Sequence, residues 1–209
     1  MTTNISCFTR LAAPLILSLF MAQSALAQDE SEVGKELAYS CLGCHGIDGY
    51  RNAYPSYRVP KLGGQKAAYL VIALKGYRDG SRSHPTMIAQ AASLTDQQIE
   101  AVAAYLAGLG GDTVAAGGSD AAAAEKSRPE AAAACVACHG PNGVSVNAIW
   151  PTIAGQHEDY LLQALKKYRD GTRTDPLMTA QAKLLAEEDL DILARYFAKL
   201  DGLETTKEK

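Results

Sequence analysis

The stretch CLGCHGIDG, residues 41–49, places two cysteines and a histidine within five positions. On a helix, positions i, i+3 and i+4 project from one face. Cys41, Cys44 and His45 would therefore present two sulfurs and one imidazole on the same side of a helix. A second copy of the motif, CVACHGPNG, occupies residues 135–143. The chain thus carries the same arrangement of side chains twice.

The repeat extends well beyond the two motifs. PKLGGQKAAYLVIALKGYRDGSR, residues 60–82, aligns with PTIAGQHEDYLLQALKKYRDGTR, residues 151–173, at an offset of 91 positions, whereas the cysteine motifs are offset by 94. The first copy therefore carries three extra residues within the segment 47–59. Two copies of one domain of about 90 residues follow, a size at the small end for independent folding.

The two copies divide the chain into domains at residues 28–110 and 120–209, joined by a linker at 111–119 that is rich in glycine and small residues. Apolar residues recur at spacings of three and four, and no segment alternates with a period of two. The sequence therefore predicts an all-α fold. Each copy should have a short helix carrying the cysteine motif, a middle helix after the GQ pair and a long terminal helix. Thr95 is the predicted N-cap of the first terminal helix, three residues before Gln98.

The first 27 residues have the pattern of a cleaved secretory signal peptide. Arg10 is their only charged residue, an apolar run follows at 11–22, and residues 25–27 match the small-x-small cleavage pattern. The remaining chain, residues 28–209, has 19 basic and 23 acidic residues, a net charge of −4. It has neither a basic run that would favour nucleic acid nor an apolar stretch long enough for a transmembrane helix. We therefore expect an exported, periplasmic protein, free or peripherally associated with the membrane.

Export to an oxidising compartment makes the four remaining cysteines decisive. An even number first suggests disulfides, but each pair has the form CxxCH. A zinc ribbon would place its second CxxC within about 15 to 20 residues of the first, whereas Cys44 and Cys135 are 91 positions apart. A dithiol redox site needs a βαβ context that the helical pattern lacks. CxxCH is the attachment pattern of c-type haem, so we predict two covalently bound haem c groups, one on Cys41 and Cys44 and one on Cys135 and Cys138.

The repeat also aligns the only two methionines of the predicted mature chain. Met87 follows His45 by 42 positions and Met178 follows His139 by 39, each two residues after a proline. Methionine is more often a flexible filler of cores, but this placement favours axial ligation of iron. We predict the ligand pairs His45/Met87 and His139/Met178, which would raise the reduction potentials and leave little room for a substrate on iron.

Other aligned residues are weaker candidates for contacts around the haems. The carbonyls of Pro60 and Pro151 are predicted to accept the ring N–H of the two histidines, with simple turn prolines as the alternative. Guanidinium groups pair well with carboxylates. Four aligned arginines are therefore predicted either to bind haem propionates or to be solvated at the surface: Arg78, Arg82, Arg169 and Arg173.

Some residues break the repeat. His84 is predicted to be a surface histidine, because Asp175 occupies its aligned place. Four aromatic residues are expected to pack against porphyrin or the domain interface: Tyr50, Tyr54, Tyr57 and Trp150.

Taken together, these residues resemble the cytochrome c4 family of exported dihaem proteins. The resemblance covers essentially the whole predicted mature chain and rests on the two CxxCHG motifs, LGGQ and IAGQ, YRDGSR and YRDGTR, and HPTM and DPLM. It implies two tandem class I cytochrome c domains related by a pseudo-twofold axis, with haem propionate edges facing across the interface. It also implies electron transfer from a membrane quinol-oxidising complex toward a haem-copper terminal oxidase. The alanine-rich segment 121–135 departs from the family pattern and leaves open how the helix that enters the second domain packs.

Two alternatives of other classes remain at this point. The cytochrome subunit of a flavocytochrome c sulfide dehydrogenase resembles this chain and would receive electrons from a flavin subunit. A dihaem peroxidase would be an enzyme in its own right, but it needs an iron with an open position, and both copies here carry methionine. The sequence therefore favours an electron carrier over an enzyme.

Overall fold

The computed structural model describes residues 31–207, so the predicted signal peptide lies outside the described residues. Over this range the chain is helical and has no strand, which confirms the all-α prediction. No helix in this range is long and apolar enough to cross a membrane. An N-terminal helix over residues 31–45 is followed by α2 (Ala67–Asp79), α3 (Pro85–Ala92), α4 (Asp96–Gly108), α5 (Asp112–Ala115), α6 (Ala121–Ser127), the 3₁₀ turn η1 (Glu130–Ala132), α7 (Val136–His139), α8 (Glu158–Asp170), α9 (Pro176–Leu184) and α10 (Glu187–Lys199).

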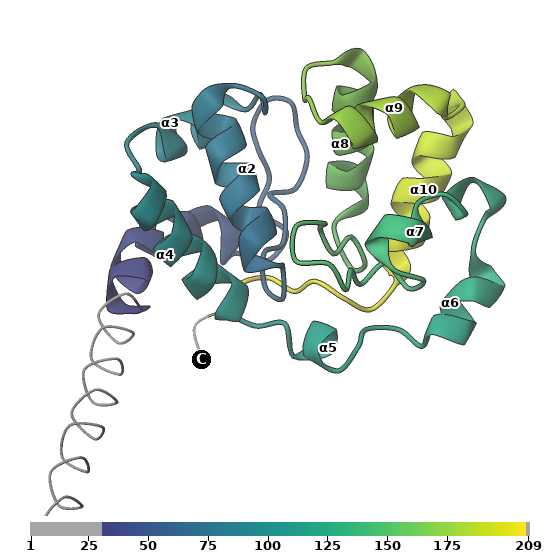
Figure 1. Ribbon diagram of the computed structural model, residues 1–209, viewed down its shortest axis with the longest axis horizontal. Coiled ribbons are helices and arrows are strands. Elements are labelled where there is room, and N and C mark those ends of the chain that lie inside the picture. Colours follow the sequence, from purple (N-terminus) through teal and green to yellow (C-terminus); the bar gives the residue numbers. More distant parts are fainter. Residues whose placement is uncertain (1–30, 208–209) are drawn as a thin grey trace, which may run out of the picture.

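Two domains of the same design lie side by side. In the first, α2 packs on α3 and α4, and in the second α8 packs on α9 and α10. These helices correspond at the offset found in the sequence, so the repeat in the sequence is a repeat in the fold. In Figure 1, α2 and α8 flank the middle of the molecule, whereas α4 and α10 lie toward its two outer sides.

The terminal helix of each domain supplies the centre of its core. Thr95 caps α4 in a capping box with Gln98, as predicted. The apolar positions of both terminal helices recur at spacings of three and four, the pattern that predicted helix. Each is at most 3% exposed: Ile99, Val102 and Leu106 in α4, and Leu190, Leu193 and Phe197 in α10.

The N-terminal helix approaches α4 at a glycine. A Cβ atom at Gly34 would lie 2.4 Å from the carbonyl oxygen of Ala101 and 3.2 Å from the Cβ atom of Tyr105. No side chain fits at the first of these distances, so the close approach of the two backbones requires glycine. Gly43 on the same helix is exposed, and a Cβ there would meet nothing within 4 Å.

Gly34→Ala should therefore lower the free energy of unfolding of the haem-loaded protein by about 1–3 kcal/mol, the usual cost of overpacking. Gly43→Ala is the matched control, and it should be neutral or stabilising by up to about 1 kcal/mol, because alanine is the better helix former. Guanidinium denaturation followed by far-UV circular dichroism measures both. Equal effects of the two substitutions would contradict the close approach.

The second domain is entered by a broken helix, which resolves the packing that segment 121–135 left open. Proline has no N–H and disfavours helical backbone in the residue before it. Arg128, which precedes Pro129, is accordingly extended, with φ −69° and ψ 125°. Ala124 of α6 is 2% exposed, and its carbonyl accepts the hydroxyl of Tyr196 at 2.9 Å. Small alanines thus let α6 pack on α10 where the first domain uses a continuous helix.

The predicted linker, residues 111–119, is held in place by hydrogen bonds to the second domain. It contains the short helix α5. The carboxylate of Glu204 accepts two of its backbone N–H groups at 3.2 and 3.0 Å. Asn142 donates to two of its carbonyls at 2.7 Å each. A segment with linker composition therefore adopts a defined path.

The loop that holds the three extra residues, 47–59, reaches the second domain. Arg58 donates from its backbone N and its Nε to the carboxylate of Asp159, at 3.1 and 3.2 Å. Arg51 Nη1 lies 3.0 Å from the same carboxylate. The insertion thus adds an ionic contact between the domains that the repeat itself does not contain.

Asp159→Asn tests this contact, and pH tests it again. Burial alone would raise the pKa of Asp159. The backbone N–H and guanidinium of Arg58, together with the guanidinium of Arg51, lower this pKa by a larger amount, so it lies below that of an ordinary aspartate. Such a carboxylate stabilises the fold above its unfolded pKa of about 3.9, and the contribution is lost as the pH falls through the folded pKa. Asp159→Asn should cost up to about 1 kcal/mol at neutral pH, because the pair is partly exposed. The difference from wild type, measured by denaturation, should shrink below about pH 4; a constant difference would mean that charge does not matter here.

The four aromatic residues that break the repeat differ in their surroundings. Tyr57 is 5% exposed and faces Tyr160 of the second domain, with ring centroids 6.3 Å apart, as expected for an interface residue. Trp150 is half-buried. Tyr50 is 44% exposed and Tyr54 is 94% exposed, so the expectation of packing is wrong for Tyr54. The loop turns only some of its side chains inward, and composition does not indicate which.

The C-terminal segment crosses from the second domain back to the first (Figure 1). Glu204 pairs with Gly63 in an antiparallel bridge, with N–H···O distances of 2.9 and 3.0 Å. Thr206 is 1% exposed and donates its hydroxyl to the carbonyl of His45 at 2.7 Å. We call residues 203–206 the C-terminal strap, because they fasten the end of the second domain to the cysteine motif of the first.

Candidate haem sites

Each cysteine motif ends a helix and places its histidine in the interior. His45 and His139 are 8% and 6% exposed. Their Nδ1 atoms lie 2.8 Å from the carbonyl oxygens of Pro60 and Pro151. A carbonyl only accepts, so Nδ1 carries the proton and donates it, which leaves the Nε2 lone pair of a neutral ring available to a metal.

Burial favours this neutral form. It lowers the pKa of His45 and of His139, and the carbonyls of Pro60 and Pro151 oppose it more weakly. Neutral imidazole is the form that binds a metal. The structure therefore prepares both rings as ligands and fixes their orientation through the carbonyl.

The two methionines occupy the first turns of α3 and α9. The backbone N–H of Met87 donates to Nδ1 of His84 at 3.4 Å, and that of Met178 donates to the carboxylate of Asp175 at 2.9 Å. Both acceptors are N-caps, and a proline follows each. His84, predicted to be a surface residue, is half-buried and has the same capping role as its aligned aspartate. Helix capping thus fixes the backbone of each methionine.

One continuous cavity of about 430 Å³ joins these residues across the two domains. Apolar side chains from both cores form much of its wall, including Leu70, Leu106, Leu161 and Phe197. The predicted haem-binding residues in the wall are Cys41, Cys44, His45 and Met87 from the first domain and Cys135, His139 and Met178 from the second. Two thiol pairs, two neutral imidazoles and an apolar cavity fit two covalently attached haems. When bound, each haem supplies an iron that changes between the ferrous and ferric states.

Comparisons with known proteins agree with this chemistry. The family model described as cytochrome c matches residues 31–110 and again residues 126–201. The chain is 31% identical to cytochrome c4 of Pseudomonas aeruginosa, over 91% of this chain and 98% of that protein. The chain belongs to the cytochrome c4 family. It is also 35% identical to a protein named thiosulfate dehydrogenase electron acceptor from Stutzerimonas stutzeri, over 91% of this chain and 94% of that one. The solved structure of reduced recombinant cytochrome c4 from Pseudomonas stutzeri aligns with a TM-score of 0.60 and 30% identity, over 83% of this chain and 98% of that one.

The chain is thus a cytochrome c4-like electron carrier with two covalently bound haem c groups. Within this dihaem cytochrome, the four arginines considered from the sequence divide into two pairs. Arg78 pairs with Asp96 at the start of α4, and Arg169 pairs with Glu187 at the start of α10. Neither arginine of this pair belongs to the cavity wall. The structure gives carboxylates of their own domains as partners to Arg78 and Arg169.

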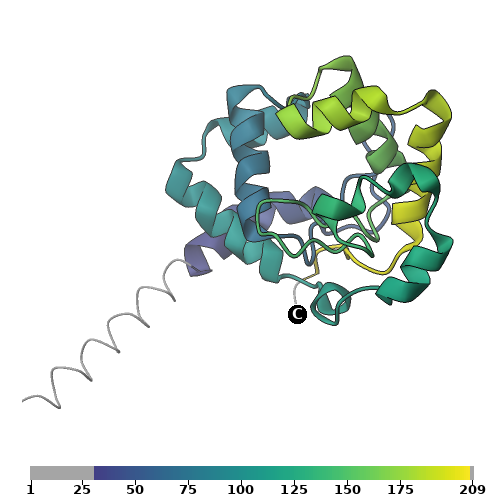
Figure 2. The same cartoon turned by 45° about the vertical axis from the view of Figure 1, so that its right-hand side comes forward.

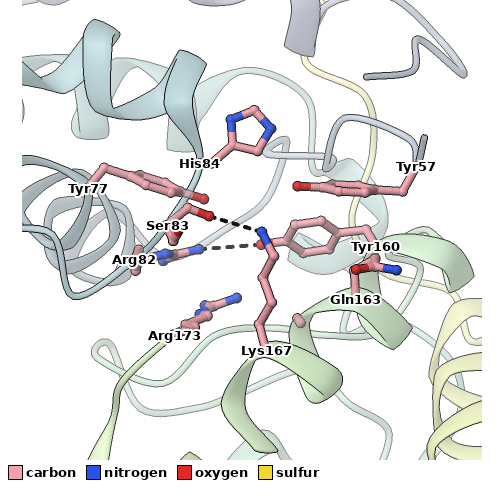
Figure 3. A pocket seen from close by; sticks show the side chains of 10 residues that line it. Tyr57, Tyr77, Arg82, Ser83, His84, Tyr160, Gln163, Lys167 and Arg173 are labelled. Atoms are coloured by element: carbon pink, nitrogen blue, oxygen red, sulfur yellow. Dashed lines mark hydrogen bonds between the residues drawn. The ribbon is translucent and has the colours of Figure 1, made fainter. Parts of the chain in front are cut away.

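The other pair, Arg82 and Arg173, meets at the domain interface and lines the cavity. Each is 7% exposed, and the two Nε atoms are buried without a partner in the described chain. Each guanidinium lies over a tyrosine ring of its own domain, Arg82 at 4.7 Å from the centroid of Tyr77 and Arg173 at 4.4 Å from that of Tyr168. Each also donates to a tyrosine hydroxyl of the other domain. Arg82 donates to Tyr160 at 3.4 Å (Figure 3), and Arg173 donates to Tyr69 at 3.0 Å.

These contacts exchange when the two domains are exchanged, because each residue and its counterpart are 91 positions apart. That is the property of a pseudo-twofold axis, and it confirms the predicted relation between the domains. In Figure 2, α2 and α4 of the first domain lie to the left and α10 of the second domain lies to the right. Lys167 breaks the symmetry, since it donates to the carbonyl of Ser83 at 2.9 Å and has no charged counterpart in the first domain at Gly76.

Sequence reasoning did not assign two further sets of residues near the haem sites. Gln65 and Gln156 are 6% and 4% exposed, and each hydrogen-bonds the other domain. The sequence does contain a signal for these two glutamines, because a GQ pair occurs at the same place in both copies of the repeat. Thr206 had no such signal, since it lies beyond the end of the repeat.

Proposed function

We propose that this cytochrome is a periplasmic electron carrier in which His45 and Met87 ligate the first haem iron and His139 and Met178 ligate the second. The observation that carries the proposal is the cavity wall, where a histidine with a free Nε2 and a methionine occur together in each domain. Three of the four predicted haem-attaching cysteines line the same cavity: Cys41, Cys44 and Cys135. Signal-peptide composition at residues 1–27 supports export.

Two consequences follow for the chemistry. A neutral thioether ligand favours ferrous iron and raises the reduction potential. If the protein fills both axial positions of each iron, no position remains for peroxide, and the dihaem peroxidase alternative is disfavoured. The unpartnered Nε atoms of Arg82 and Arg173 support the proposal that these two arginines face haem propionates, because a buried N–H needs an acceptor.

Besides the flavin subunit considered from the sequence, the physiological donor has two candidates. Membership of the cytochrome c4 family favours a membrane quinol-oxidising complex as donor and a haem-copper oxidase as acceptor. The relative named thiosulfate dehydrogenase electron acceptor favours a thiosulfate-oxidising enzyme as donor instead. In both cases the partners are redox proteins and this chain transforms no substrate of its own.

The ligands are tested by Met87→Ala and Met178→Ala. Ferric haem with a methionine ligand has a near-infrared sulfur-to-iron charge-transfer band, and each substitution should remove about half of its intensity, because each iron has one sulfur ligand. The double variant should lose the band. An unchanged band in Met87→Ala would remove Met87 from the proposed ligand set, and the same holds for Met178.

The donor is tested by stopped-flow reduction of the oxidised protein. One arm uses thiosulfate dehydrogenase with thiosulfate, and the other uses a quinol-oxidising complex with its quinol. The physiological donor should reduce the protein with a second-order rate constant of about 10⁶ M⁻¹s⁻¹ or more. Reduction at least tenfold faster in one arm identifies the donor class, and slow reduction in both would count against both.

A further inference from the structure

We infer that Gln65 and Gln156 tune the haem of the opposite domain, each by holding the peptide group that orients the other haem's histidine. The inference rests on the proposed ligation of iron by His45 and His139. It concerns positioning residues, since neither glutamine belongs to the set that attaches or ligates haem.

The contact from the first domain to the second involves a single peptide group. The carbonyl of Pro151 faces Nδ1 of His139 at 2.8 Å. The N–H of the same peptide, on Thr152, donates to Oε1 of Gln65 at 3.0 Å. Nε2 of Gln65 also donates to the carbonyl of Thr152 at 2.9 Å. A chain of hydrogen bonds therefore runs from the second haem's histidine, through one peptide, to a side chain of the first domain.

The reverse contact has the same form. The carbonyl of Pro60 faces Nδ1 of His45 at 2.8 Å. The N–H of that peptide, on Lys61, donates to Oε1 of Gln156 at 2.9 Å, and Nε2 of Gln156 donates to the carbonyl of Lys61 at 2.9 Å. The two glutamines are 91 positions apart, as are the two residues that they bind. The links are thus related by the pseudo-twofold axis.

Both glutamines are held rigidly. Their Oε1 atoms also accept the N–H of the following residue, Lys66 or His157, at 3.0 Å in each case. Their side chains are almost completely buried, at 6% and 4% exposure. Moving a buried amide whose donor and acceptor are both hydrogen-bonded costs free energy, because those hydrogen bonds would break. The peptide that it holds is therefore fixed relative to the other domain.

The link has an electronic effect as well as a positional one. A hydrogen bond to the N–H side of a peptide polarises it and strengthens its carbonyl as an acceptor. A stronger acceptor pulls the Nδ1 proton, makes the imidazole more basic, and so stabilises ferric iron. By linkage, oxidation of one haem strengthens the hold of the opposite domain's glutamine. Each haem thereby affects the other domain through hydrogen bonds of the protein chain itself.

The test replaces each amide by an apolar side chain of similar length, Gln65→Met and Gln156→Met. Redox titration followed by NMR of the haem methyl resonances, assigned to each haem through contacts with its own domain, gives both midpoint potentials. Gln65→Met should shift only the haem on Cys135 and Cys138 to a more positive potential, and Gln156→Met only the haem on Cys41 and Cys44. Each variant is the control for the other, because a general loosening of the interface would move both haems in both variants.

A shift confined to the haem of the mutated domain, equal shifts of both haems, or no shift would overturn the inference. Should the methionine variants fail to incorporate haem, Gln65→Asn and Gln156→Asn keep the sites polar but shorten the reach by one methylene group, and the same crosswise shifts are expected. The proposed ligation is read separately from the methyl resonances of Met87 and Met178. Their absence would reject the ligands, whereas their presence with the wrong pattern of shifts would reject only the role of the glutamines.

Discussion

A chain in which serine replaces Cys41, Cys44, Cys135 and Cys138 is expected to lose cooperative unfolding. The reason is the position of the cavity, whose wall is made of core residues from both domains. At about 24 cal/mol per Å³, leaving 430 Å³ empty would cost at most about 10 kcal/mol. The whole free energy of folding of a domain is about 5–15 kcal/mol. Because these two free energies are of similar size, we expect haem to be needed as a part of the core.

Circular dichroism with thermal melting measures this effect. The fourfold variant should have reduced helicity and no cooperative transition. The paired variants Cys41→Ser with Cys44→Ser and Cys135→Ser with Cys138→Ser separate the domains, and each should lose the haem and the ordered core of its own domain while weakening the other through the shared interface. Native helicity with a cooperative melt in the fourfold variant would show that the protein core suffices without haem.

The sequence predicted what recurs within each domain. Apolar spacing in α4 and α10 located the cores, Thr95 located a cap, and the position of the proline carbonyls anticipated the 2.8 Å contacts of both histidines. These features depend on neighbours along the chain or on the repeat. Such signals are visible without coordinates.

Contacts between the domains were much harder to predict. Arg78 and Arg82 are four positions apart in the same YRDGSR segment, yet one binds Asp96 within its domain and the other lies at the pseudo-twofold axis. Arg78 lies in the last turn of α2, whereas Arg82 follows the end of that helix. The path of the chain after α2 decides which arginine reaches the partner domain, and a sequence repeat does not contain that information. The same limit applies to Gln65, whose partner Thr152 is 87 positions away.

Among the contacts between the domains, the C-terminal strap was the hardest to predict, because it lies beyond the repeat. A chain that ends at Gly202 should show how much the strap contributes to stability. Truncation exposes the pocket of Leu203, which is 2% exposed, and removes the pairing of Glu204 with Gly63 and the hydrogen bond from Thr206 to His45. Burial of one leucine contributes about 1.5–3 kcal/mol and each hydrogen bond about 0.5–1.5 kcal/mol. With one leucine and three hydrogen bonds removed, the free energy of unfolding of the haem-loaded protein should fall by about 3–7.5 kcal/mol, measured by guanidinium denaturation.

Thr206→Val separates the hydrogen bond from the rest of the strap. It keeps the shape of the side chain but leaves the buried carbonyl of His45 without its donor, which should cost about 1–3 kcal/mol. The perturbation should be seen first in the haem on Cys41 and Cys44, although the substituted residue belongs to the second domain in sequence. Unfolding of the truncated chain at the wild-type midpoint would mean that the strap contributes nothing, whereas a change confined to the second haem would mean that it acts within its own domain. The expected result would mean that the first haem motif is fully hydrogen-bonded only when the end of the second domain is in place. The two domains of this cytochrome would then fold as one unit.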